Sequence, residues 1–133
     1  MIELTLPFPP SVNHYKKPGR LIKTKNGKIY QTRINTSETN VFYHAVWVLI
    51  CQLKSSKGIK PFDSATILSL ELDVYPPDRK RRDIDNLAKV AIDSLQIGGL
   101  IPDDYQIARL LIQRMNMIPK GQVIVRVSEL ICT

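Results

Sequence analysis

The chain has 133 residues, 44% of them hydrophobic and 23% charged, a composition typical of a single folded domain spanning residues 1–133. Its 19 Lys and Arg residues outnumber 12 Asp and Glu residues, and the resulting net charge of +7 favours a polyanionic partner such as nucleic acid. The two cysteines are far apart and form no CxxC or Cys/His array, so neither a zinc site nor a disulfide framework is indicated. Without a signal core or a bilayer-spanning apolar run, we expect a soluble, cytoplasmic protein.

The N-terminal part of the chain predicts a short strand followed by a basic hairpin. Ile2, Leu4 and Leu6 alternate with polar residues, and the prolines of residues 7–10 end the strand. We expect a loop over residues 11–18 and a hairpin over residues 20–32 that turns at Asn26-Gly27. The polar and basic residues of this region are either a solvated surface or an arm that contacts DNA backbone, and the candidates for contact are Asn13, Lys16, Lys17 and Arg20.

The middle of the chain predicts a helix and then a strand. Asn35 or Thr36 is expected to cap the helix, which continues to about Lys54. We expect its apolar residues, from Val41 to Leu53 and with Trp47 beside them, to pack in the core, and His44 to lie on the surface or to be a satisfied core histidine. Apolar residues then alternate with polar ones over residues 68–75, which predicts the clearest strand in the chain.

Residues 78–104 contain the densest arrangement of charged residues in the sequence. Four consecutive cations, residues 79–82, lead directly into Asp83 and Asp85. A helical stripe of apolar residues follows and ends at the glycine pair 98–99. Asp103 and Asp104 come next, in a turn after a proline.

The last part of the chain predicts two strands, over residues 107–117 and 123–127, with a turn between them. Together these elements indicate an α+β fold with a mixed β-sheet and two main helices, in which the last two strands pair as a hairpin. Asp83 and Asp85 follow one strand and Asp104 precedes another, so we expect both groups at the same edge of the sheet.

Each of these charged residues also has a structural explanation. Asp83 or Asp85 suits a helix N-cap, Asp103 and Asp104 suit a turn, and Lys89 suits a pair with an acid one helical turn away. One cap needs one Asp, however, and two acids within three residues exceed that need. Carboxylates beside cations are suited to Mg²⁺ and phosphate, so the pattern also supports metal-assisted phosphodiester hydrolysis, with Lys89 stabilising charge on the phosphate.

Two segments of the sequence resemble the RusA family of Holliday-junction resolvases. They are RKRRDIDNLAKVAIDSL, followed by GLIPDD, and the opening LTLPFPPSVNHYK. The resemblance implies a small homodimeric, often prophage-encoded endonuclease that requires Mg²⁺ and cuts four-way DNA junctions in pairs. The family's essential acids carry over to Asp83, Asp85 and Asp104, with Asp103 as a neighbouring candidate ligand, and its essential lysine to Lys89. The basic hairpin is longer than the connection usual in the family.

The sequence thus predicts a Mg²⁺-dependent, homodimeric endonuclease that resolves Holliday junctions and is located with the nucleoid. Its DNA contacts are expected from Arg79, Lys80, Arg81 and Arg82, together with Asn13, Lys16, Lys17 and Arg20. Two alternatives remain open. One is a nuclease for other branched DNA, and the other is a DNA-binding module without catalysis, whose acids only cap helices and balance charge.

Overall fold

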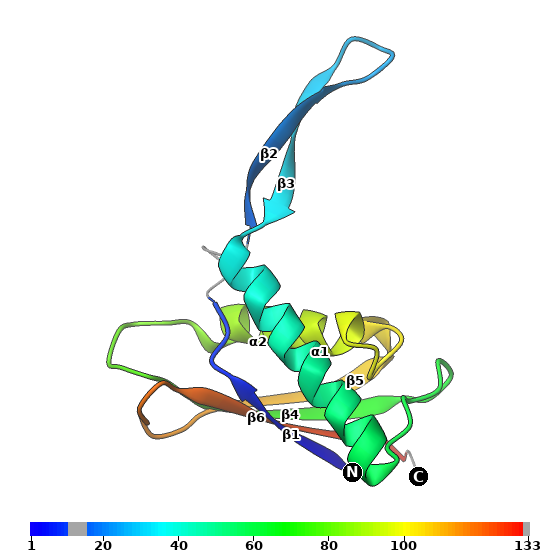
Figure 1. Ribbon diagram of the computed structural model, residues 1–133, viewed down its shortest axis with the longest axis vertical. Coiled ribbons are helices and arrows are strands. Elements are labelled where there is room, and N and C mark those ends of the chain that lie inside the picture. Colours follow the sequence, from blue (N-terminus) through cyan, green and yellow to red (C-terminus); the bar gives the residue numbers. More distant parts are fainter. Residues whose placement is uncertain (11–15, 132–133) are drawn as a thin grey trace.

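The computed structural model describes residues 1–10 and 16–131 and has two parts, a helix-covered sheet and a hairpin that projects from it (Figure 1). In chain order the elements are β1 (Ile2–Pro7), β2 (Lys16–Lys23), β3 (Ile29–Asn35), α1 (Ser37–Lys57), β4 (Leu68–Tyr75), α2 (Ile84–Ile97), the short 3-10 helix η2 (Asp104–Gln106), β5 (Ile107–Arg114) and β6 (Gln122–Glu129). The predicted order of strands and helices is confirmed, as is the α+β class with a mixed sheet. Within the described residues, neither helix is both long and apolar enough to cross a membrane.

The main sheet has the strand order β1-β6-β4-β5, with β4 antiparallel to β6 and parallel to β5. The expected hairpin of the last two strands is therefore wrong, because β4 lies between them. The connection from β5 to β6 crosses the end of β4, where the amides of Met115 and Ile118 donate to the carbonyl oxygens of Val74 and Pro76 at 2.8 and 3.0 Å. As a result β1 and β5 form the two edges of the sheet.

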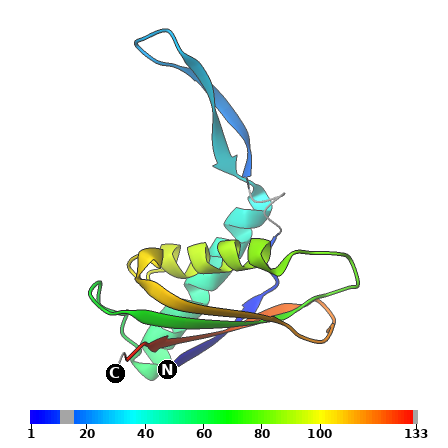
Figure 2. The ribbon, with the colours of Figure 1, turned by 180° about the vertical axis from the view of Figure 1, so that it is seen from behind.

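One face of this sheet is apolar and lies under both helices (Figure 2). In β4 the side chains of Leu68, Leu70 and Leu72 are fully buried in the same hydrophobic cluster as residues of α1 and α2. The alternate positions of the strand point to the opposite, polar face, where Asp73 forms an ion pair of 2.8 Å with Arg126. This alternation was the basis of the strand prediction. It also determines which face of the sheet packs against the helices.

Helix α1 begins at the predicted cap, where the Thr36 hydroxyl accepts a hydrogen bond from the Thr39 amide at 3.3 Å. The prediction that Val41 and Trp47 pack in the core is wrong, because their side chains are 69% and 48% exposed. The buried side of the helix is centred on Val46 and the residue one turn later, Ile50, so Val41 and Trp47 lie outside it.

Helix α2 ends where the sequence predicted, at the glycine pair. Gly99 has a φ of +79°, which glycine adopts without steric cost. A side chain at Gly98 would come within 2.5 Å of the Ile50 side chain of α1, so this glycine also permits the close approach of the two helices. The two glycines thereby set the direction of the segment that connects α2 to Asp103 and Asp104.

The hairpin of β2 and β3 is longer than predicted. Its turn at Asn26-Gly27 is confirmed, with a φ of +79° at Gly27. The strands continue to a pair between Lys16 and Asn35, so the expectation of a loop as far as Pro18 is wrong for residues 16–18. Both views show the hairpin standing away from the sheet, beyond the start of α1 (Figures 1 and 2).

Candidate active site

The predicted acids lie at opposite ends of α2. Asp83 and Asp85 are at its N-terminal end, after β4, whereas Asp104 is in η2, before β5. Since β4 and β5 are parallel, the end of β4 and the start of β5 lie at opposite ends of the paired strands. The 14 residues of α2 alone span about 21 Å at about 1.5 Å per residue. The expectation that both groups share one edge of the sheet is therefore wrong.

Two hydrogen bonds connect these ends to the strands. At one end, Arg114 in the last position of β5 donates to the carbonyl oxygen of Arg82 at 2.7 Å. At the other end, the Gln106 side chain donates to the Thr66 carbonyl oxygen, just before β4, at 2.9 Å. The separation of the acids thus follows directly from the parallel pairing of β4 and β5.

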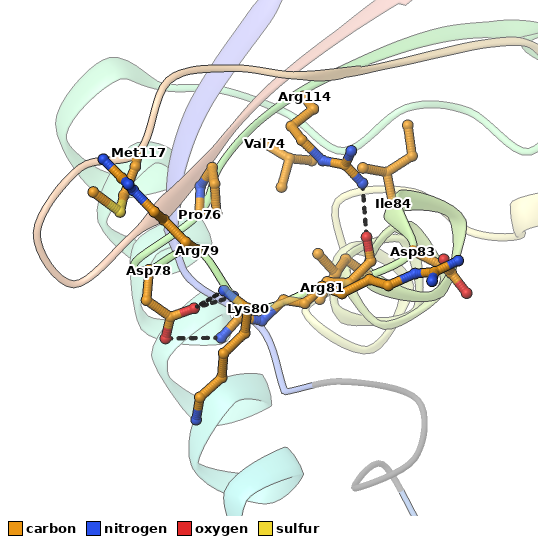
Figure 3. Close-up of a pocket in the computed structure, with 12 residues that line it drawn as sticks. Val74, Pro76, Asp78, Arg79, Lys80, Arg81, Asp83, Ile84, Arg114 and Met117 are labelled. Atoms are coloured by element: carbon orange, nitrogen blue, oxygen red, sulfur yellow. Dashed lines mark hydrogen bonds and ion pairs between the residues drawn. The ribbon is translucent and has the colours of Figure 1, made fainter.

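At the N-terminal end of α2, basic side chains surround a cavity of about 470 Å³ (Figure 3). Its lining comprises Val74, Pro76, Asp78, Arg79, Lys80, Arg81, Arg82, Asp83, Ile84, Leu87, Arg114 and Met117. Figure 3 shows Arg114 reaching in from one side, opposite the run of residues 78–83. Positive charge next to a helix N-terminus is a favourable environment for phosphate.

The four cations of the run differ in their surroundings. Arg82 forms a two-point ion pair with Asp78, at 2.6 and 3.2 Å, and its guanidinium lies 5.2 Å from the centre of the Phe8 ring. Hydrogen bonding from Arg82, and then from the Lys80 amide, lowers the pKa of Asp78 to about 2. Arg82 is therefore held by the protein itself, whereas no ion pair within the described residues engages Arg79, Lys80 or Arg81.

The carboxylates beside this cavity are exposed and little used by the fold. Asp83 occupies the N-cap position of α2, but its side chain makes no capping hydrogen bond. The Asp85 carboxylate accepts one hydrogen bond, from the Asn86 amide at 3.0 Å. Capping therefore does not account for the Asp83 side chain, and both carboxylates are accessible to a ligand.

The acids at the other end of α2 differ from each other. Asp103 caps η2, because its carboxylate accepts from the Tyr105 amide at 3.0 Å and its own amide donates to the Gln106 side chain at 3.0 Å. The neighbouring Asp104 carboxylate is exposed and forms no hydrogen bond or ion pair within residues 1–10 and 16–131. Of the two, Asp104 is the one that the fold leaves available.

Lys89 lies one turn into α2 and has the ionic partner that its structural explanation requires. Its amine lies 2.9 Å from the Asp93 carboxylate, four residues later. The Lys89 side chain is nevertheless 57% exposed, so the pair lies on the surface of the helix. Its partner Asp93 is only 14% exposed, so the exposed end of the pair that a phosphate can reach is the Lys89 amine.

One chain does not gather a metal site from these residues. Asp and Glu carboxylates are the donors that Mg²⁺ prefers. However, no three His, Cys, Asp or Glu side chains lie close enough together to hold a metal ion in the described part of the chain. The carboxylates suit Mg²⁺ chemically, but the described part of one chain brings no three of them together.

The remaining DNA-contact candidates lie on or before the hairpin. Lys17 and Arg20 are exposed on β2, and Lys16 is the first residue of that strand. Asn13 lies outside the described residues. The structure thus separates these candidates from the basic cavity, since the two sets belong to different parts of the fold (Figure 1).

Sequence reasoning overlooked two residues of the cavity. Asp78 stands four residues before Arg82, and this spacing between opposite charges was a usable signal. Arg114 had no local signal, because it reaches the cavity through the pairing of β4 with β5, which places it opposite Val74.

Comparisons with known proteins agree with the family resemblance seen in the sequence. Residues 7–128 match the family described as Endodeoxyribonuclease RusA. A protein of Shigella sonnei named Crossover junction endodeoxyribonuclease RusA is 28% identical over 129 residues, which cover 96% of this chain and 93% of that protein. Proteins of the same name from Escherichia coli K12 and Enterobacteria phage 82 are each 26% identical, with the same shares covered.

Proposed function

The chain belongs to the RusA family of endodeoxyribonucleases, and from this membership we propose that it cuts four-way DNA junctions with Mg²⁺ as its cofactor. The observation that carries the proposal is the basic cavity at the start of α2, next to the exposed carboxylates of Asp83 and Asp85. Its place of action is then the cytoplasm, at the nucleoid, where branched DNA occurs.

The residues of the cavity have separate roles in this proposal. Arg79, Lys80 and Arg81 bind phosphates of the DNA backbone, while the Asp78–Arg82 pair holds the run in place. Lys89 exchanges Asp93 for the phosphate and stabilises the charge that develops there. When bound, Mg²⁺ supplies positive charge next to the phosphate.

We infer that the acids of one site come from two subunits. A single chain places Asp104 about one helix length from Asp83 and Asp85. Strand β5 is an edge of the sheet, and its Leu110 and Leu111 are 45% and 38% exposed. If β5 pairs antiparallel with its copy around a two-fold axis, the start of each β5 lies beside the end of the other.

This pairing resolves the disagreement between the acids and the single chain. Asp104 of one subunit then lies beside Asp83 and Asp85 of the other, and the dimer has two equivalent sites. A four-way junction needs two cuts to separate into nicked duplexes, so two sites related by a two-fold axis match the substrate. The homodimer is thus part of the proposed mechanism.

The test is a cleavage assay with the purified chain on a four-way junction, a fork and a linear duplex of shared sequence. We expect paired cuts in the junction with Mg²⁺, none with EDTA, and little cutting of the duplex. Preferred cutting of the fork would favour a nuclease for other branched DNA. Tight junction binding without cutting in Mg²⁺ would leave a DNA-binding module as the better description.

A further inference from the structure

The hairpin arm, residues 16–35, contains the whole excess of positive charge. Seven of the chain's 19 basic residues and none of its 12 acidic residues lie in it, so the rest of the chain has equal numbers of both. The seven are Lys16, Lys17, Arg20, Lys23, Lys25, Lys28 and Arg33. A projecting ribbon of this charge is complementary to a polyanion.

The arm also exposes apolar side chains near its outer end. Ile22 pairs with Tyr30, and Lys23 pairs with Ile29, in the last two positions before the turn. The exposed fractions of these apolar side chains and of Leu21 are large, at 65% for Leu21, 37% for Ile22, 67% for Ile29 and 50% for Tyr30. Successive residues of a strand point to opposite faces, so Ile22 and Tyr30 lie on one face of the ribbon and Leu21 and Ile29 on the other. We call these four residues the tip cluster. A hairpin that served only as a solvated basic surface would not require exposed apolar side chains. Exposed apolar patches mark interaction sites.

The sheet and helices do not cover this cluster. The arm stands away from the rest of the described chain in both views (Figures 1 and 2). An isolated two-stranded hairpin is only marginally stable in water. Contact of the tip cluster with a partner would therefore stabilise the arm.

We propose that the tip cluster contacts unstacked bases at the branch point of DNA, while the basic residues of the arm contact the surrounding phosphates. Paired duplex offers many phosphates to cations but hides the apolar faces of its bases within the stack. At a branch point those faces are easier to reach, because less stacking has to be broken. The inference rests on the proposed function, since it takes branched DNA as the substrate.

Tyr30 is the residue of the arm best suited to this contact. It is the arm's single aromatic residue, and its ring is half exposed beside Ile22. Aromatic rings stack on any base, so the contact recognises an open branch rather than a sequence. Contact between two arms is disfavoured by their like charge.

The test compares a tip variant with a variant at the base of the arm. The tip variant is Ile22→Thr with Tyr30→Thr, since threonine keeps the β propensity of the hairpin. The control is Ile34→Thr, which changes an apolar side chain that is 46% exposed at the other end of β3. Tyr30→Phe, which keeps the ring, serves as a rescue. Affinity for a junction and for a linear duplex is measured with each protein, using a junction with 2-aminopurine at the branch point.

We expect the tip variant to lose junction affinity by about tenfold or more, as stacking contacts do on truncation. Its duplex affinity and oligomeric state should match those of the parent, and the 2-aminopurine fluorescence change should disappear. The control and Tyr30→Phe should behave as the parent. An unchanged preference for the junction would contradict the proposal. So would a tip variant that sediments as a smaller species, because the cluster would then contact a second copy.

The result also separates this inference from the proposed function. If the parent binds the junction through its tip cluster but cuts nothing in Mg²⁺, the proposed function fails and the inference stands. If the parent and the tip variant bind and cut the junction equally, the inference fails and the proposed function stands.

Discussion

The two ends of α2 contrast in what they offer a substrate. The N-terminal end has a basic cavity and two exposed carboxylates, Asp83 and Asp85. The C-terminal end has one available carboxylate, Asp104, beside an acid that the fold uses as a cap. Within the described residues neither end alone brings three acids together, and the exposed acids of the two ends complement each other. The contrast supports the proposal that the site is divided between subunits, and the predictions below test that proposal.

The largest effect is expected from replacing an available acid. Asp83→Asn, Asp85→Asn and Asp104→Asn keep the size of the side chain but remove the charge that a hard metal needs. Cleavage should fall by more than about 100-fold. Even residues that only hydrogen-bond to a metal ligand typically cost about 10- to 100-fold in metal affinity or activity when they are replaced. Junction binding should persist or tighten, because repulsion between carboxylate and phosphate is lost. Gel-shift and cleavage assays on the same junction measure both, and robust cutting by Asp85→Asn would overturn the assignment.

Asp103 is the matched control for Asp104 at the C-terminal end. Asn caps helices about as well as Asp, so Asp103→Asn should retain the cap of η2. Its cleavage rate should stay within about threefold of the parent, and its free energy of unfolding within about 0.5 kcal/mol. A loss of cleavage equal to that of Asp104→Asn, at unchanged stability, would make Asp103 a ligand and weaken the distinction between the two acids.

A smaller effect distinguishes the cations of the N-terminal end. Each phosphate contact contributes about −0.9 to the slope of log K against log salt, so the Arg79→Ala, Arg81→Ala double variant should flatten the slope by about 1.8 per subunit, or about 3.6 for the proposed dimer. Arg82→Ala should leave the slope near that of the parent, because Asp78 already holds Arg82. Titrations of a junction at several salt concentrations give these slopes. An unchanged slope in the double variant would reduce the run to a solvated surface.

The smallest effect is a pH dependence of stability at the same end. Folding lowers the pKa of Asp78 from 3.8 to about 2, chiefly through the hydrogen bond from Arg82. The resulting stabilisation is complete above the unfolded pKa and is lost as the pH falls from 3.8 towards 2. Urea unfolding at several pH values should detect a small loss over this window that Asp78→Asn lacks. Identical pH profiles for the two proteins would contradict the role given to this pair.

Much of the fold was accessible from local patterns. Periodicity predicted both helices and β4, and Asn26-Gly27 predicted the hairpin turn. The order of the strands was not accessible, because the insertion of β4 between β5 and β6 depends on pairing between distant segments. Trp47 was misplaced for a related reason, since helical spacing does not say which side of α1 meets the sheet.

The candidate site divides in the same way. The spacing of Asp83, Asp85 and Lys89 was visible in the sequence, and so was the later pair of acids. Their separation was not, because it follows from the parallel pairing of β4 and β5. Asp103 caps η2, whereas the Asp104 carboxylate does not, and this difference depends on the backbone geometry of η2. The sequence of a turn does not specify that geometry.

The central claim, a site shared between subunits, is tested most directly by mixing two inactive variants. Asp85→Asn and Asp104→Asn are each prepared as pure protein and then mixed under conditions that exchange subunits. In a mixed dimer with shared sites, one site receives both changes and the other receives none, so nicking of the junction should return. Up to half of the dimers should then be active, each with one working site. If each site belongs to one chain, every site in the mixture has one change, and cleavage that stays at the level of the separate variants would contradict the account.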